Sequence, residues 1–255
     1  MRQIAADHIM VAPNGARRGK ADHPALPVTA AELAKVAQSC FEAGAGAIHA
    51  HVRDREGRHS LDAGLYGEAI AAIKDAAPDM RIQITTESAG VCDIAQQEAC
   101  LAAVAPRWAS IARREMAVDE GAARRIYAGC AERGTEVQHI LYAAEEIDQL
   151  IGWQKAGVIP EGPLCAIFVL GSYAGREAVP GDLDAFLARP GFGALRDWTV
   201  CAFGKQERAC LLQALARGGR VRIGFENNLW HPDGQFLRDN AEAVQALIEA
   251  ATAAP

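Results

Sequence analysis

Residues 47–54 read A-I-H-A-H-V-R-D, and the rest of the chain is interpreted outward from this stretch. In an extended strand, alternate side chains point to opposite faces. One face would be apolar, and the other would carry His49, His51 and Arg53. Two imidazoles at positions i and i+2 of one strand face can hold a single zinc ion. The alternative is one histidine in the core and one on the surface.

A second alternating stretch lies near the C-terminus, where residues 221–228 read V-R-I-G-F-E-N-N. Its polar face would carry Arg222 and Glu226. If the polar faces of the two stretches meet, His49, His51 and Glu226 form a three-ligand site with one position open for water or substrate. The two stretches together therefore predict a catalytic zinc site.

Eight extended stretches alternate with segments of helical spacing along the 255 residues. The expected strands are roughly 8–14, 47–54, 81–88, 108–114, 136–142, 163–171, 198–204 and 221–227. The expected helices are roughly 30–43, 61–76, 94–105, 119–133, 145–155, 182–188, 206–217 and 236–251. This alternation is typical of a parallel sheet covered by helices. Eight repeats in this length favour an α/β fold of one domain, a TIM-type (β/α)8 barrel over residues 1–255.

Composition restricts the class of protein. The net charge of −6 and a pI near 5.7 argue against a nucleic-acid partner. Seven cysteines without a C-x-x-C pair fit a reducing compartment. Residues 1–9 lack the apolar core of a signal peptide, and no apolar run is long enough to span a membrane. We therefore expect a cytoplasmic protein with no membrane partner.

The first predicted helix begins with a capping box, in which Thr29 is followed three residues later by Glu32. The loop before it, residues 14–27, is long and polar. In a barrel this loop lies on the face where active sites are built. We expect Asn14, at its start, to bind substrate. The basic residues that follow are interpreted either as contacts to an anionic substrate or as a solvated loop.

Charged residues gather at the ends of the third and fourth predicted strands. Alternation in residues 81–88 directs Gln83, Thr85 and Glu87 toward the barrel axis, and Ser88 follows at the rim as an expected substrate contact. The fourth strand ends in R-R-E at residues 113–115. Arg113 can clamp a carboxylate or phosphate in a bidentate manner. The alternative is a cluster of surface salt bridges.

Several motifs resemble those of the β-keto acid cleavage enzymes. They are D-H-P-A-L-P-V-T at 22–29, E-A-G-A at 42–45, H-A-H-V-R-D-x-x-G-R-H-S-L-D at 49–62, F-V-L-G at 168–171, F-G-K-Q at 203–206 and V-R-I-G-F-E-N-N-L at 221–229. The resemblance covers nearly the whole chain in the right order. It implies a TIM barrel that forms a homo-oligomer, a dimer or tetramer. It also implies zinc held by two histidines and a glutamate, at positions matching His49, His51 and Glu226.

The resemblance implies a reaction in which a β-keto acid and acetyl-CoA give acetoacetate and the CoA thioester of the remaining acyl group. Zinc would polarise the 3-keto oxygen, and an enolate-like carbon would attack the thioester before a retro-Claisen step. By position, Arg222 matches the family arginine beneath the metal. Thr85 matches a hydroxyl residue that holds the substrate carboxylate.

The chain departs from the family pattern in its acids. Asn227 stands where the family has an aspartate thought to be the base, and an amide cannot take up a proton at neutral pH. Gln138 or Ile140 replaces a glutamate on the fifth strand. We hypothesise that Glu87 or Glu115 supplies the lost carboxylate. The catalytic candidates are therefore Arg222, Glu87 and Asn227.

The charges at these strand ends can have either of two roles. As a catalytic replacement, Arg113 would take over from a short hydroxyl residue as the anion clamp. The alternative is that the charged strand ends are only solvated.

Three functions remain open. The leading one is zinc-dependent β-keto acid cleavage with acetyl-CoA. The second is zinc-assisted hydrolysis or carbon–carbon cleavage of a small carbonyl acid without CoA. The third is a barrel that binds metal and a small acid without turnover. His59 is interpreted as lying in a surface turn, and the alternative is a supporting position behind the metal ligands.

Overall fold

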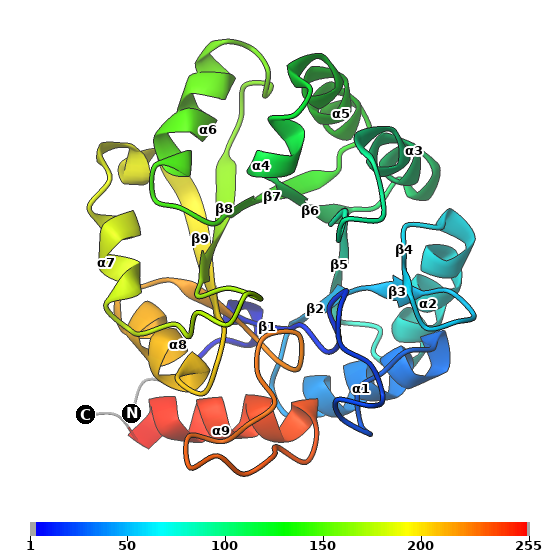
Figure 1. The fold of residues 1–255 in the computed structure, drawn as a ribbon, viewed down its shortest axis with the longest axis vertical. Coiled ribbons are helices and arrows are strands. Elements are labelled where there is room, and N and C mark those ends of the chain that lie inside the picture. Colours follow the sequence, from blue (N-terminus) through cyan, green and yellow to red (C-terminus); the bar gives the residue numbers. More distant parts are fainter. Residues whose placement is uncertain (1–3, 254–255) are drawn as a thin grey trace.

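Eight parallel strands close into a barrel in the computed structural model, which describes residues 4–253 (Figure 1). The order around the barrel is β1-β10-β9-β8-β7-β6-β5-β2. Their bounds are β1 Ile9–Val11, β2 Ala47–Ala50, β5 Arg81–Thr85, β6 Trp108–Ala112, β7 Glu136–Leu141, β8 Leu164–Leu170, β9 Leu195–Ala202 and β10 Arg220–Ile223. The predicted TIM-type α/β barrel is confirmed.

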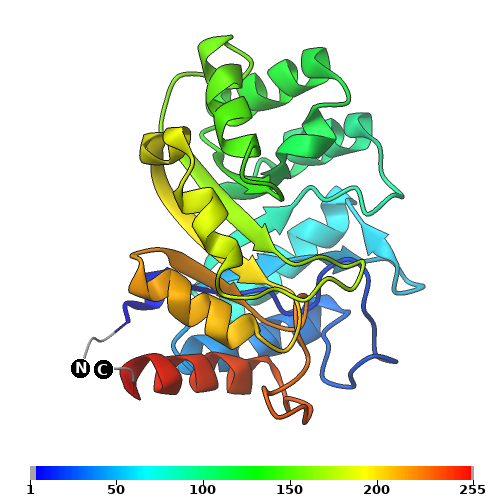
Figure 2. The same cartoon turned by 60° about the vertical axis from the view of Figure 1, so that its left-hand side comes forward.

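Helices surround the barrel, and α8 and α9 pack against each other on its outside (Figures 1 and 2). The α-helices are α1 Ala30–Glu42, α2 Ala63–Ala76, α3 Ile94–Val104, α4 Arg113–Met116, α5 Glu120–Glu132, α6 Glu146–Lys155, α7 Asp182–Leu187, α8 Glu207–Ala216 and α9 Asn240–Ala253. Short 3-10 helices span Ala6–His8 (η1) and Pro190–Ala194 (η2). The capping box of α1 is present as predicted, with Thr29 and Glu32 bonding each other's backbone.

Within residues 4–253, none of the helices combines the length and apolar character needed to cross a bilayer. The first three residues of the N-terminal stretch 1–9 lie outside the part of the chain that the structure describes.

The stretch 47–54 is not one continuous strand. β2 ends at Ala50, and Val52–Arg53 (β3) pairs antiparallel with His59–Ser60 (β4) as a small separate hairpin. The prediction that Arg53 shares a strand face with the two histidines is therefore wrong. The guanidinium of Arg53 donates instead to backbone carbonyls of the loop after β1, those of residues 15, 16 and 18. Those carbonyls have no strand partner, so Arg53 fixes the loop.

The stretch 221–227 also stops early, because β10 ends at Ile223 and Gly224 begins a tight turn. Gly224 has φ +138, and a Cβ there would lie 2.5 Å from the carbonyl oxygen of Ala12. Only glycine can adopt this conformation so close to a neighbouring backbone. The turn brings Glu226 across the mouth of the barrel.

The predicted fourth strand ends at Ala112, two residues earlier than expected. Arg113 begins the short helix α4, so the charged residues 113–115 lie on a helical turn and not on a strand end. A helical turn points its side chains in several directions, and strand alternation does not describe them.

We predict that Gly224→Ala lowers the free energy of unfolding by more than about 2 kcal/mol, because it adds both a steric clash and backbone strain. Urea denaturation would measure the change. Gly67→Ala is the matched control, since Gly67 lies inside α2 with open space around it. That control should be neutral or stabilising by up to about 1 kcal/mol. Equal stability of the two variants would contradict the role given to Gly224.

Candidate metal centre

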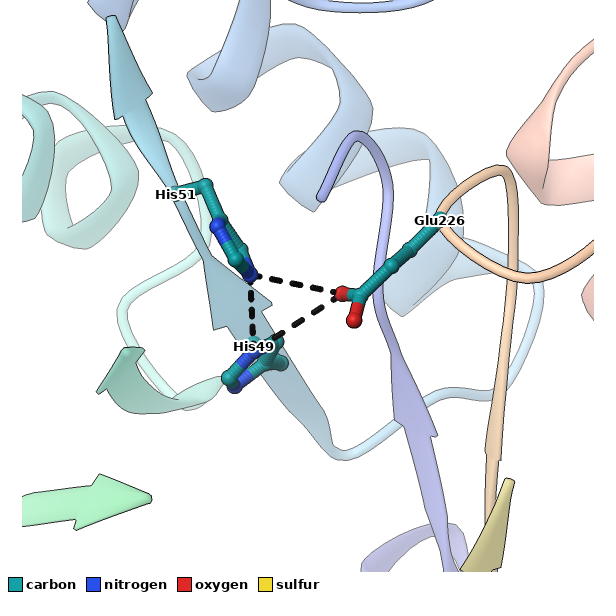
Figure 3. A group of neighbouring side chains, drawn as sticks. All are labelled: His49, His51 and Glu226. Carbon is teal, nitrogen blue, oxygen red and sulfur yellow. Dashed lines mark hydrogen bonds and ion pairs between the residues drawn. The ribbon is translucent and has the colours of Figure 1, made fainter. Parts of the chain in front are cut away.

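Three predicted ligands meet at the C-terminal mouth of the barrel (Figure 3). His49 lies on β2, His51 directly follows it, and Glu226 lies in the turn after β10. The Nε2 atoms of the two histidines are 3.1 Å apart. Oε2 of Glu226 lies 3.7 Å from Nε2 of His49 and 3.5 Å from Nε2 of His51. All three side chains are buried.

This triangle fits a tetrahedral metal ion. Metal–nitrogen bonds of about 2.0–2.1 Å at tetrahedral angles separate two ligand atoms by about 3.3 Å. Oε2 of Glu226 has no hydrogen-bond partner although it is buried. Burial lowers the pKa of His49 well below its usual range, an effect that Arg222 increases and Glu226 opposes. His49 is therefore neutral, as a metal ligand must be.

A chain of buried polar side chains orients His49 from within the barrel. Nδ1 of His49 lies 2.7 Å from Oε1 of Gln83, which can only accept, so Nδ1 carries the proton and Nε2 faces the other ligands. The Gln83 amide donates to Oε1 of Gln138, and the Gln138 amide donates to Oγ1 of Thr199. The chain thus fixes the imidazole from β5, β7 and β9.

Two further contacts hold the carboxylate of Glu226. Arg222 donates from Nη2 to Oε1 of Glu226 over 2.9 Å, and the hydroxyl of Tyr173 donates to the same oxygen over 3.3 Å. Burial alone would raise the pKa of Glu226, but the guanidinium of Arg222 beside it holds that pKa well below its usual range. Glu226 is therefore a carboxylate with one oxygen free to bind a metal.

Asn14 supports the other side of the cluster. Its amide donates to the carbonyl oxygens of His51 and Pro27 over 2.9 and 3.1 Å. It thus fixes the backbone that presents His51 and ties both ends of the long loop to β2. Oδ1 of Asn14 is buried without a hydrogen-bond partner.

Comparison with known proteins shows which protein family this chain belongs to. The model of the beta-keto acid cleavage enzymes matches residues 8–254. The chain belongs to the beta-keto acid cleavage enzyme family. It is 29% identical over 244 residues to the 3-keto-5-aminohexanoate cleavage enzyme of Fusobacterium nucleatum, covering 93% of this chain and 88% of that protein. It is 26% identical over 257 residues to the 3-oxoadipate:acetyl-CoA acetyltransferase of Cupriavidus necator, covering 95% and 87%.

Solved structures share the fold of this family member. Apo ObcA superposes with a TM-score of 0.66 at 16% identity, covering 89% of this chain but only 62% of the ObcA chain. The type I 3-dehydroquinate dehydratase of Clostridium difficile has a TM-score of 0.62 at 10% identity, covering 97% and 94%. At these identities the likeness concerns the barrel alone.

The departures from the family pattern can now be located. Asn227 is fully buried beside Glu226, and neither atom of its amide has a hydrogen-bond partner. The side chains of Gln138 and Ile140 both point into the interior of the barrel. Gln138 belongs to the chain behind His49, whereas Ile140 lies nearer the mouth in an apolar cluster.

Thr85 is the last residue of β5, and Glu87 lies two residues beyond it, because the strand ends earlier than the predicted residue 88. Oγ1 of Thr85 accepts the backbone N–H of Glu87 over 2.9 Å, which leaves its own proton free to donate. Burial raises the pKa of Glu87, and the nearby carboxylates of Glu226 and Glu115 add to this effect. The side chain of Glu87 is thus buried and lies within electrostatic reach of two metal-ligand candidates.

Ser88 and Arg113 do not reach the cluster. The hydroxyl of Ser88 donates to Oε1 of Glu115, whose other oxygen accepts from Gln97, so these three side chains form a local bracket. The guanidinium of Arg113 stacks on Trp153 of α6, 4.6 Å from the ring centroid. The guanidinium groups of Arg17 and Arg114 lie over the rings of Tyr173 and Tyr142.

The expected surface turn at His59 is wrong. His59 is buried, its ring lies 5.3 Å from that of His51, and its Nε2–H donates to the carbonyl of Glu87 over 2.7 Å. Sequence reasoning also missed the roles of Gln83 and Tyr173. Alternation placed Gln83 toward the axis, but Tyr173 comes from the loop after β8, for which no periodic signal exists.

We predict that Gln83→Leu weakens zinc binding about 10- to 100-fold, because His49 loses the acceptor that fixes its ring. Competition against a fluorescent zinc chelator would measure the affinity. Gln83→Glu is the control, since a carboxylate still accepts from Nδ1 and should restore most of the affinity. Unchanged affinity in the leucine variant would show that Gln83 does not orient the ligand.

Proposed function

We propose that this protein is a zinc-dependent β-keto acid cleavage enzyme. It condenses a β-keto acid with acetyl-CoA to give acetoacetate and an acyl-CoA. The observation that carries the proposal is the buried cluster of His49, His51 and Glu226 at the barrel mouth. Relatives named for acetyl-CoA, such as the acetyltransferase of Cupriavidus necator and a 3,5-dioxohexanoate:acetyl-CoA acetone transferase, support the second substrate.

The three residues would hold zinc, which when bound supplies a Lewis acid for a carbonyl oxygen. Arg222 keeps Glu226 ionised and fixed, and Gln83 presents the bare nitrogen of His49. Thr85, with its hydroxyl proton free, donates to the substrate carboxylate. Arg17 and Arg114 add positive charge at the mouth, where both substrates arrive as anions.

Proton transfer falls to Glu87 in this proposal. Asn227 cannot accept a proton, and Glu115 is held in its bracket with Ser88 and Gln97. Glu87 is buried at the same mouth, and its raised pKa makes it a stronger base than an ordinary carboxylate. Its ionised form takes the proton from C2 of the keto acid, and Asn227 contributes hydrogen bonds from its unpartnered amide.

The direct test measures acetoacetate formation from a panel of β-keto acids, with and without acetyl-CoA, on protein of known zinc content. We expect product only with acetyl-CoA. His49→Ala should lose both zinc and product, while the half-exposed His231→Ala should retain both. Product without acetyl-CoA would favour hydrolysis or carbon–carbon cleavage. Zinc without any product would favour a binding role.

We predict that Glu87→Gln lowers kcat at least about 100-fold with zinc content unchanged. In the native protein, activity should rise with pH as Glu87 loses its proton, with a midpoint above that of an ordinary glutamate because its pKa is raised. The glutamine variant should lack this rise. Glu115→Gln keeps the shape of the bracket and should change kcat less than tenfold. A larger loss in Glu115→Gln would transfer the role to that residue.

A further inference from the structure

One half of the barrel mouth is apolar. The upper inward positions of β6 to β9 form a separate buried cluster, which we call the apolar wall, and two tyrosines pack against it. The wall consists of Ala112, Ile140, Ile167, Val169, Cys201 and Phe203, with Tyr142 and Tyr173. These residues are neighbours in the sheet register, since Ile140 pairs with Ala112 and Ile167, and Val169 pairs with Cys201.

The apolar wall directly adjoins the candidate metal centre. Tyr173 packs edge-on against Phe203, with ring centroids 4.4 Å apart, while its hydroxyl reaches Glu226. Cys201 lies 3.4 Å from Nη2 of Arg222, which binds Glu226 from the other side. The mouth thus has a polar half on β2, β5 and the turn after β10, and an apolar half opposite.

The outer faces of the two tyrosines are already occupied by cations. The guanidinium of Arg17 lies 4.9 Å from the ring centroid of Tyr173, and that of Arg114 lies 3.3 Å from that of Tyr142. An ammonium group entering the wall would therefore meet like charge and no carboxylate of the wall. A second carboxylate would be attracted by these two arginines, but both are engaged on the tyrosine rings, and burying its charge against alkyl and aromatic carbon costs its hydration.

Resting on the proposed function, we infer that the keto acid has an uncharged, apolar group beyond its 3-keto carbon. A ketone carbon is planar and directs its two substituents to opposite sides. When the carboxylate side lies in the polar half with Thr85, the other substituent points to the apolar wall. The substrate class is therefore a 3-oxo acid with an alkyl or aryl tail, without an amino group or second carboxylate on that tail.

Three six-carbon acids test the inference, namely 3-oxohexanoate, 5-amino-3-oxohexanoate and 3-oxoadipate. Calorimetry on the zinc-loaded protein without acetyl-CoA measures binding, and the acetoacetate assay measures kcat/KM. We expect 3-oxohexanoate to bind at least about tenfold tighter than either charged acid and to have a kcat/KM at least about 100-fold higher. Equal or tighter binding of a charged acid, or no binding of 3-oxohexanoate, would overturn the inference.

Binding and turnover separate the two proposals. Selective binding of 3-oxohexanoate without acetoacetate from any acid would leave the inference standing and reject the proposed function. Acetoacetate formed best from a charged acid would support the proposed function and reject the inference.

A substitution in the apolar wall gives a second test. Ile140→Glu should shift the binding preference at least about tenfold toward 5-amino-3-oxohexanoate, because it places a carboxylate beside the tail. Val118→Glu makes a similar change at an exposed position and should leave the preference unchanged. If Ile140→Glu does not fold, Ile140→Thr replaces the ethyl arm of the side chain with a hydroxyl and should weaken 3-oxohexanoate binding severalfold. A folded Ile140 variant with the native preference would show that the wall does not contact the tail.

Discussion

The buried pair of Arg222 and Glu226 is the interaction on which the site depends. Both side chains are 4% exposed, and their atoms approach to 2.9 Å. A carboxylate in this interior would take up a proton if it stood alone, because an isolated buried charge is costly. Arg222 lies on β10, and the turn at Gly224 folds the chain back so that Glu226 meets it four residues later. The guanidinium thus preserves the negative charge that faces the two imidazoles.

Around this pair, different strands of the barrel supply the polar and the apolar side chains. β2, β5 and the turn after β10 supply imidazoles, a hydroxyl and carboxylates, whereas β6 to β9 supply alkyl and aromatic groups nearer the mouth. Below both halves, the amides of Gln83 and Gln138 cross the interior as a continuous hydrogen-bonded chain. Such a chain limits rotation of His49 because each amide has its donor and acceptor fixed by the next.

Strand alternation in the sequence was sufficient to place His49, His51 and Glu226 together and to direct Gln83 inward. It could not show where a strand ends, because a period of two is equally regular on both sides of the last ladder bond. Arg53 and Arg113 were misplaced for this reason, one in a hairpin and the other in a helical turn. Tyr173 could not be placed because its position depends on a loop conformation, and His59 was placed wrongly because it belongs to the small hairpin after β2. Gly224 was the residue in the sequence that could have indicated the turn after β10.

The closure of the barrel sets an order of events during synthesis. β1 pairs with both β2 and β10, so β1 cannot complete its hydrogen-bonded pairing until β10 has been synthesised. Glu226 follows His51 by about 175 residues, which at the usual pace of translation means roughly 9–35 seconds. Throughout that interval the nascent chain contains two of the three candidate ligands, His49 and His51. The complete three-ligand cluster therefore forms only after the ribosome has added Glu226.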